Sequence, residues 1–235
     1  MEKGTKEDKE AWQENPEHNF VYNKLWLCKS QDINAAPVPV EPDSYPVFYK
    51  PIVNLYALGR KAFRAESQIG KKPDPGMFWM EALEGVHWTL DCRFDGVFKD
   101  SFELQAEKEN DQFKLWKPYE EDLTWVESWV KENLSSYRGP LNIEGIGDKI
   151  MEVHLRNSTQ LQLLKRRNLS YSAPVFGKDD EKYDVDWRSL PSNAIVTVSK
   201  GGSSEAGGRI GYTLANTREE AFNLKKTIRE HVRIS

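Results

Sequence analysis

Apolar and polar residues alternate along several stretches in the middle of this chain. That pattern is typical of strands with one buried face, because successive side chains of a strand point to opposite sides. The ranges that predict strands are 47–55, several stretches within 76–107, 141–146, 149–156, 195–199 and 208–215. A tight turn is expected at Asp95-Gly96, since glycine accepts positive φ angles.

Apolar residues spaced by three and four predict helices elsewhere in the chain. The ranges are 20–33, 124–137, 159–168 and 218–232. Thr217 with Glu220 forms a capping box at the start of the last helix. The proline-rich segment 35–46 predicts an extended connector, and the polar segment 171–192 predicts a long loop. Strands dominate the middle and helices lie between and after them, so the pattern predicts an α+β fold.

The hairpin predicted over 141–156, LNIEGIGDKIMEVHLR, brings two carboxylates together. If its turn centres on Asp148, Glu144 lies opposite Glu152. Like charges directly opposite each other destabilise a sheet. Two interpretations follow: a register shifted by one residue, which would leave both as ordinary surface glutamates on different faces, or a divalent cation that neutralises them. With the turn centred on Asp148, Asn142 also lies opposite His154.

The bulk composition limits the classes of protein that this chain can represent. With 235 residues it fits one large domain or two small ones. Its net charge of −4 and pI near 5.7 argue against a general nucleic-acid binder. The start of the sequence is charged and unlike a secretory signal, so we expect a cytoplasmic protein with Cys28 and Cys92 as reduced thiols.

Several common catalytic motifs do not occur in the sequence. It contains no GxxxxGK[ST] phosphate loop, no GxGxxG after a strand, no CxxC or HExxH zinc motif and no GxSxG elbow. GGSSEAGG at 201–208 matches none of them and is expected to be a flexible hairpin loop. The chemistry must therefore come from residues that are dispersed along the chain.

Three dispersed features remain, each of which is also typical of an ordinary surface. Lys24 follows Asn23 at a helix, Lys50 ends the strand YPVFYKP, and an acidic segment interrupts the apolar residues of WMEALEGVHW. In this order, and followed by IEGIGDKIMEVHLR, they resemble the motifs of the ATP-grasp superfamily. The resemblance covers about residues 20–160.

The resemblance implies two lobes, each with an antiparallel sheet and helices, that hold ATP between them. The lobes would span about 20–80 and 81–235, after a charged arm at 1–19. The resemblance also implies a ligand for each motif. Lys24 and Lys50 would bind the phosphates, with LGRKAFRAES (58–67) as a loop over them, while Met80, Glu81, Ala82 and Leu83 would bind adenine and His87 would bind ribose. Glu144, Glu152 and His154 would bind Mg²⁺, and Arg156 with Lys50 would contact the transferring phosphoryl group.

The sequence departs from the family pattern in three ways. Only a charged arm of about twenty residues precedes Lys24, where the family usually has a domain that binds the acceptor substrate. The two lysines are only 26 positions apart, so the first lobe is reduced. His154 stands where the family has asparagine, and a nitrogen ligand changes the expected metal preference, with Mn²⁺ as one possibility.

The resemblance therefore implies an ATP- and metal-dependent ligase that activates a carboxylate as an acylphosphate for attack by an amine or thiol. Its partners would be ATP, a small-molecule or peptide carboxylate, and a protein that supplies acceptor recognition. Two alternatives are a non-catalytic ATP-binding scaffold and a protein or nucleic-acid interaction domain. The run Lys165-Arg166-Arg167 is interpreted as either a solvated helix end or an anionic acceptor site. Arg209 is a second candidate for such an acceptor site.

Overall fold

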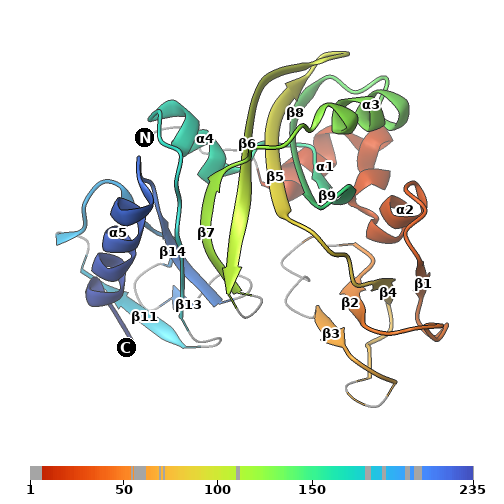
Figure 1. Ribbon diagram of the computed structural model, residues 1–235, viewed down its shortest axis with the longest axis horizontal. Coiled ribbons are helices and arrows are strands. Elements are labelled where there is room, and N and C mark those ends of the chain that lie inside the picture. The colour runs from red at the N-terminus through yellow and green to blue at the C-terminus, as the bar shows by residue number, and fades with distance from the viewer. Residues whose placement is uncertain are drawn as a thin grey trace. The chain divides into compact units, whose positions relative to one another are not determined.

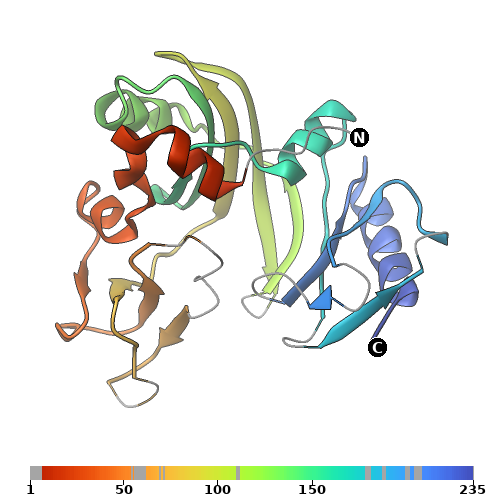
Figure 2. The ribbon, with the colours of Figure 1, turned by 180° about the vertical axis from the view of Figure 1, so that it is seen from behind.

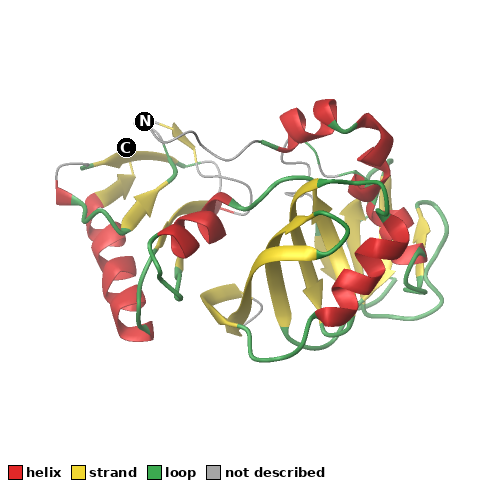
Figure 3. Cartoon of the chain, turned by 90° about the horizontal axis from the view of Figure 1, so that it is seen from above, coloured by secondary structure: helices red, strands yellow, loops and turns green. Residues whose placement is uncertain are grey.

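The computed structural model forms two compact units that are discontinuous in sequence. The first comprises residues 1–103 and 121–159, and the second comprises 104–120 and 160–235. Within them the structure describes residues 7–53, 55, 62–68, 70, 72–109, 112–177, 181–186, 189–198, 202–203 and 208–234 (Figure 1). The predicted α+β class is confirmed, with strands and helices in both units (Figure 3). The predicted division into an arm and two lobes stays a prediction.

The first unit contains two antiparallel sheets and most of the helices. Its elements are α1 (Asp8–Glu14), η1 (Pro16–Tyr22), α2 (Lys24–Lys29), β1 (Ala35–Pro37), β2 (Val47–Pro51), β3 (Phe63–Ala65), β4 (Met77–Glu81), β5 (His87–Phe94), the start of β6 (Phe98–Glu109), α3 (Thr124–Asn133), β8 (Gly139–Ile146) and β9 (Lys149–His154). One sheet has the order β1-β4-β2-β3, and the other contains β5, β8 and β9 in that order. Both η1 and α2 pack against β9, and Figure 2 shows them beside it.

The second unit is built from short strands and one long helix. Its elements are the rest of β6, β7 (Gln112–Pro118), α4 (Thr159–Arg166), β10 (Pro174–Phe176), β11 (Lys182–Val185), β12 (Ala194–Val196), β13 (Gly202–Ser203), β14 (Arg209–Thr213), α5 (Arg218–His231) and β15 (Val232–Ile234). The sheets have the orders β10-β14-β12 and β13-β11-β15, and β6 pairs with β7. Helix α5 covers the first of these sheets (Figure 1).

Two helix predictions need correction in their bounds. The helix predicted over 20–33 is instead η1 followed by α2. The break occurs at Asn23, whose side chain accepts a hydrogen bond from the backbone N–H of Trp26 at 3.0 Å and so caps a new helix. The helix predicted over 124–137 ends at Asn133 because Leu134 leaves helical geometry.

Three predicted loops contain strands. The segment 171–192 includes β10 and β11, which have only three and four residues and are too short for a clear alternating pattern. In the predicted loop 58–67, residues 63–65 form β3, whereas residues 58–61 lie outside the described part of the chain. In the predicted loop 201–208, residues 202–203 form β13, whereas 201 and 204–207 lie outside the described part of the chain.

The start of α5 confirms the predicted cap. The Thr217 side chain accepts from the Glu220 N–H at 3.1 Å, while the Glu220 carboxylate accepts from the Asn216 N–H at 2.8 Å. Cys28 and Cys92 are buried free thiols, as predicted. Among the described residues, no helix is both long and apolar enough to cross a membrane.

Candidate functional site

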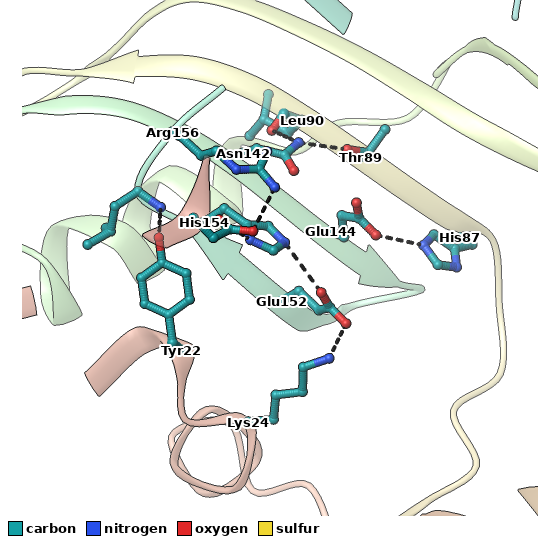
Figure 4. A network of polar contacts seen from close by, with 12 residues as sticks. Tyr22, Lys24, His87, Thr89, Leu90, Asn142, Glu144, Glu152, His154 and Arg156 are labelled. Atoms are coloured by element: carbon teal, nitrogen blue, oxygen red, sulfur yellow. Dashed lines mark hydrogen bonds and ion pairs between the residues drawn. The ribbon is translucent and has the colours of Figure 1, made fainter. Parts of the chain in front are cut away.

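The β8–β9 hairpin has the register that the sequence predicted. Glu144 pairs with Glu152 and Asn142 pairs with His154, so these side chains emerge on one face of the sheet (Figure 4). An irregularity after Glu144 shifts the register toward the turn. Of the two interpretations of the paired glutamates, the structure therefore excludes the slipped register.

A feature of this hairpin that the sequence analysis missed is the need for glycine at position 145. A Cβ atom there would lie 2.1 Å from the buried ring of Trp88. The Trp88 indole N–H donates to the Gly147 carbonyl at 2.8 Å, which fixes the ring against the hairpin. The irregular end of the hairpin is thus determined by packing against β5.

Helix α2 brings Lys24 to Glu152, and their side chains form a short ion pair (Figure 4). Lys24 begins the helix, where its backbone N–H donates to the Ile52 carbonyl at 2.8 Å. Its side chain is buried, with 8% exposed. The pairing joins residues 128 positions apart in the sequence.

Both hairpin carboxylates are ionised, because each has a cationic or hydrogen-bonding partner. Burial alone would raise the pKa of Glu152, but Lys24 and His154 hold it well below its usual value. Burial likewise opposes ionisation of Glu144, and the contact with His87 lowers its pKa overall. The two atoms of that contact, His87 Nε2 and Glu144 Oε2, are 3.6 Å apart.

Lys50 lies near the end of β2, where the charges of Lys24, Glu144 and Glu152 act on its side chain. It is buried, and burial together with the charge of Lys24 lowers its pKa to about 8, against the opposing effect of Glu152. Its ammonium group is 5.6 Å from the ring centroid of Phe48 on the same face of the sheet. The structure therefore brings Lys24 and Lys50 close to the two glutamates.

Arg156 and His154 share a carboxylate that the sequence analysis did not identify. Asp8 of α1 lies 3.0 Å from His154 Nδ1 and 2.8 Å from Arg156 Nη2. Burial alone would raise the pKa of Asp8, but the contacts with His154 and Arg156 lower it to about 2. No local signal identifies Asp8, because it lies in a charged segment 146 residues before His154.

His154 is held between two carboxylates. Its Nε2 atom is 3.3 Å from Glu152 Oε2, opposite the contact of Nδ1 with Asp8. Burial would lower the pKa of His154, but these two hydrogen bonds raise it to about 9. Next to it, the Leu155 N–H donates to the Tyr22 hydroxyl at 3.2 Å and so holds the end of β9 against η1.

The predicted adenine segment, Met80 to Leu83, includes the last two residues of β4 and the two residues after it. The Glu81 N–H donates to the Asn34 carbonyl at 2.9 Å, and the Ala82 N–H donates to the Pro46 carbonyl at 3.2 Å. Met80 is buried and Leu83 packs beside it in one apolar cluster. These contacts fix the segment, and its role with adenine stays a prediction.

The carboxylate oxygens on the hairpin are suitable ligands for a hard divalent cation. Glu144 and Glu152 are ionised and lie on one face, and Mg²⁺ is commonly bound by one or two carboxylates together with substrate phosphates. Within the described part of the chain, no three His, Cys, Asp or Glu side chains converge as a metal site. Both ring nitrogens of His154 face carboxylates. The role of His154 as a metal ligand stays a prediction. Glu144 and Glu152 are the two residues whose chemistry suits a divalent cation.

Two of the basic residues considered as an anion site, Arg167 and Arg209, donate hydrogen bonds to neutral groups in the second unit. The Arg167 guanidinium donates to the Ser192 carbonyl and to Asn193 Oδ1, both at 2.9 Å. Arg209 donates to Gln160 Oε1 at 3.4 Å. These contacts favour the interpretation of Arg167 as a structural residue.

No family model and no curated protein sequence matches this chain. Solved structures do match it. An L-amino acid ligase from Bacillus licheniformis is 12% identical, with a TM-score of 0.58 over 92% of this chain and 72% of that one. A carboxyaminoimidazole ribonucleotide synthase from Aspergillus clavatus, complexed with ATP, is 14% identical, with a TM-score of 0.56 over 90% and 73%.

A third match is an ATP-grasp superfamily protein from Archaeoglobus fulgidus, which is 15% identical. Its TM-score is 0.50, over 83% of this chain and 63% of that one. Identities this low carry information about the fold alone. The fold that the motifs predicted is confirmed: this chain has the ATP-grasp fold.

Proposed function

We propose that this chain is an ATP- and divalent-metal-dependent ligase that activates a substrate carboxylate as an acylphosphate. The observation that carries the proposal is the convergence of cations and paired carboxylates on one face of the β8–β9 hairpin. Phosphoryl transfer is catalysed mainly by positioning and by neutralising charge, and this set of residues supplies both. The shared fold supports the proposal, since two structural neighbours are a ligase and a synthase complexed with ATP.

Each predicted site residue has a role in the proposed reaction. Lys24 and Lys50 bind the phosphates, Arg156 and Lys50 stabilise the charge of the transferring phosphoryl group, Met80, Glu81, Ala82 and Leu83 bind adenine, His87 binds ribose, and Glu144 and Glu152 hold the metal beside His154. Before ATP binds, Lys24 is already paired with Glu152. Binding therefore exchanges this ion pair for contacts with phosphate oxygens and metal.

The proposed reaction has two steps. An oxygen of the substrate carboxylate bonds to the γ-phosphorus, the bond from that phosphorus to the β–γ bridging oxygen breaks, and ADP leaves. An amine or thiol then attacks the acyl carbon, loses its proton, and releases phosphate. Glu144 and Glu152 would hold Mg²⁺ or Mn²⁺, and the bound cation would offset the negative charge of the triphosphate. The chain's own residues hold the phosphates in line and provide no nucleophile.

One observation favours the alternative of a non-catalytic ATP-binding module. Arg156 and His154 are already paired with Asp8, an arrangement compatible with binding that is not followed by turnover. The formation of ADP separates the two functions. A ligase releases ADP when a mixture of carboxylates and amines is added, whereas a binding module binds ATP saturably without releasing it.

The decisive experiment is thermal unfolding with a non-hydrolysable ATP analogue, with and without Mg²⁺ or Mn²⁺. An analogue at about 100 times its dissociation constant should stabilise the protein by about 2.7 kcal/mol. We expect Glu152→Gln to lose the metal-dependent part of this shift and all turnover. Glu132→Gln, which removes an exposed carboxylate from α3, is the matched control and should behave as the wild type.

Two results would contradict the proposal separately. Unfolding curves that no nucleotide shifts, with any metal, would remove the nucleotide site itself. Turnover by Glu152→Gln at a rate near that of the wild type would instead leave the nucleotide site in place and remove Glu152 from the metal site.

A further inference from the structure

Asp8 of α1 occupies the position between the two cations that end β9. One of its oxygens is 3.0 Å from His154 Nδ1 and the other is 2.8 Å from Arg156 Nη2. All three side chains are largely buried, with 22%, 11% and 20% exposed for Asp8, His154 and Arg156. The carboxylate thus provides an internal anion to Arg156, which in the proposed function faces the transferring phosphoryl group, and to His154 beside it.

The contact with Asp8 leaves one hydrogen-bond donor of the Arg156 guanidinium without a partner among the described residues. Arg156 Nη1 donates to the Asn157 carbonyl at 3.2 Å and Nη2 to Asp8, but within the described part of the chain the buried Nε atom has no hydrogen-bond partner. Asp8 reaches Arg156 at Nη2 and also contacts His154 and Tyr22, and its carboxylate forms no hydrogen bond with Nε. A terminal phosphoryl group has three oxygens and can reach His154 and two nitrogens of Arg156.

The helix that carries Asp8 has few anchoring contacts. Of its seven residues, Ala11 is the one that is fully buried. Trp12 adds a ring contact with Tyr22, at 5.4 Å between centroids. Helices this short are marginal without packing, and segments with few buried contacts open at low free-energy cost. Detachment of α1 is therefore compatible with an intact sheet beneath it.

We propose that Asp8 is an internal competitor of the phosphoryl group, and that α1 must release it before a triphosphate ligand can engage His154 and Arg156. The proposal rests on the proposed function, because that function places the terminal phosphate at Arg156. It assigns α1 the role of an autoinhibitory segment, closed over the free site and open in the liganded one.

Asp8→Asn tests the proposal on the full-length chain. The substitution keeps the size of the side chain and removes the competing charge, so the dissociation constant of a non-hydrolysable ATP analogue with Mg²⁺ should fall about tenfold. Glu14→Gln removes the same charge from an exposed position of the same helix and should change the constant less than about twofold. Asp8→Ala provides a second variant, and circular dichroism verifies the fold of each.

Hydrogen exchange on the wild type gives a readout that does not depend on any substitution. We expect the backbone amides of residues 10–15 to exchange at least about tenfold faster when the analogue is bound, because α1 is then displaced. Unchanged or slower exchange would overturn the proposal. So would an Asp8→Asn variant that binds the analogue no tighter than the wild type, since Asp8 would then be a positioning residue for Arg156.

Inorganic triphosphate separates a failure of this proposal from a failure of the proposed function. If no variant binds the nucleotide, but Asp8→Asn binds triphosphate more tightly than Glu14→Gln, the nucleotide function is wrong and the competing anion remains. If triphosphate binds both variants equally, or neither, the competing role of Asp8 is wrong.

Discussion

The cations of the two units differ in what neutralises them. In the first unit, Lys24, His154 and Arg156 are paired with buried carboxylates from distant parts of the sequence. In the second unit, Arg167 is exposed and its partners are a backbone carbonyl and an amide oxygen of a nearby loop. Both regions contained candidate anion sites in the sequence. The structure distinguishes them by their burial and their partners.

The difference shows which arrangement is suited to chemistry. Buried ion pairs cost desolvation and add little net stability, so a cluster of them on one sheet face favours a functional explanation. An exposed arginine that holds a loop needs no explanation beyond stability. We refer to Lys24, Lys50, Glu144, Glu152, His154, Arg156 and Asp8 as the charged cluster.

The largest effect that tests this comparison is the pH dependence of stability through His154. The folded-state pKa of His154, about 9, lies above the ordinary value of 6.5. The contribution of protonated His154 to the free energy of unfolding is therefore complete below about pH 6.5 and disappears as the pH rises through about 9. Its size is about 3 kcal/mol of unfolding free energy. Urea unfolding of the wild type and His154→Gln, with a chelator present, measures it.

The expected result is a stability gap between the two proteins that narrows from neutral to alkaline pH. Other titrating groups are common to both proteins and cancel in the difference. A gap that stays constant across this range would mean that His154 is neutral in the folded state, and the charged cluster would then have one cation fewer.

A smaller effect is expected from Lys50→Met. The ammonium group is buried and burial lowers its pKa to about 8, so its removal should leave the free energy of unfolding unchanged or raise it. The affinity for the ATP analogue should nevertheless fall about tenfold, or about 1.4 kcal/mol. Binding calorimetry and urea unfolding of the same sample give both numbers.

Lys29→Met is the matched control for Lys50→Met, because Lys29 is an exposed lysine at the end of α2. It should change neither the nucleotide affinity nor the stability measurably. An equal loss of affinity in both variants would point to a general effect of charge, rather than to a phosphate contact made by Lys50.

The smallest expected effect concerns the basic run. Arg167→Gln removes the guanidinium that donates to Ser192 and Asn193 and should lower the unfolding free energy by about 0.5 kcal/mol, the usual scale for exposed contacts of this kind. Arg166→Gln, its exposed neighbour, serves as the control. Nucleotide affinity should be unaffected by either change. A loss of affinity in Arg167→Gln alone would place the basic run in the ligand site after all.

The sequence by itself determined the local geometry that makes this site possible. Alternation along β8 and β9 fixed which side chains share a face, and a turn at Gly147-Asp148 fixed Glu144 opposite Glu152. The order of the lysine, hinge and acidic motifs led to the correct fold. These features follow from periods of two residues and from turn chemistry, both of which are written in short stretches of sequence.

Only the tertiary structure decided which charges meet. The partners of Glu152 and Arg156 come from helices more than 120 residues earlier in the chain, and Asp8 lies in the segment that the sequence predicts as a charged arm. Likewise, the strands of 171–192 depend on pairings that form with the rest of the fold. Contacts between distant segments are selected by packing of the whole chain, and no local pattern records them.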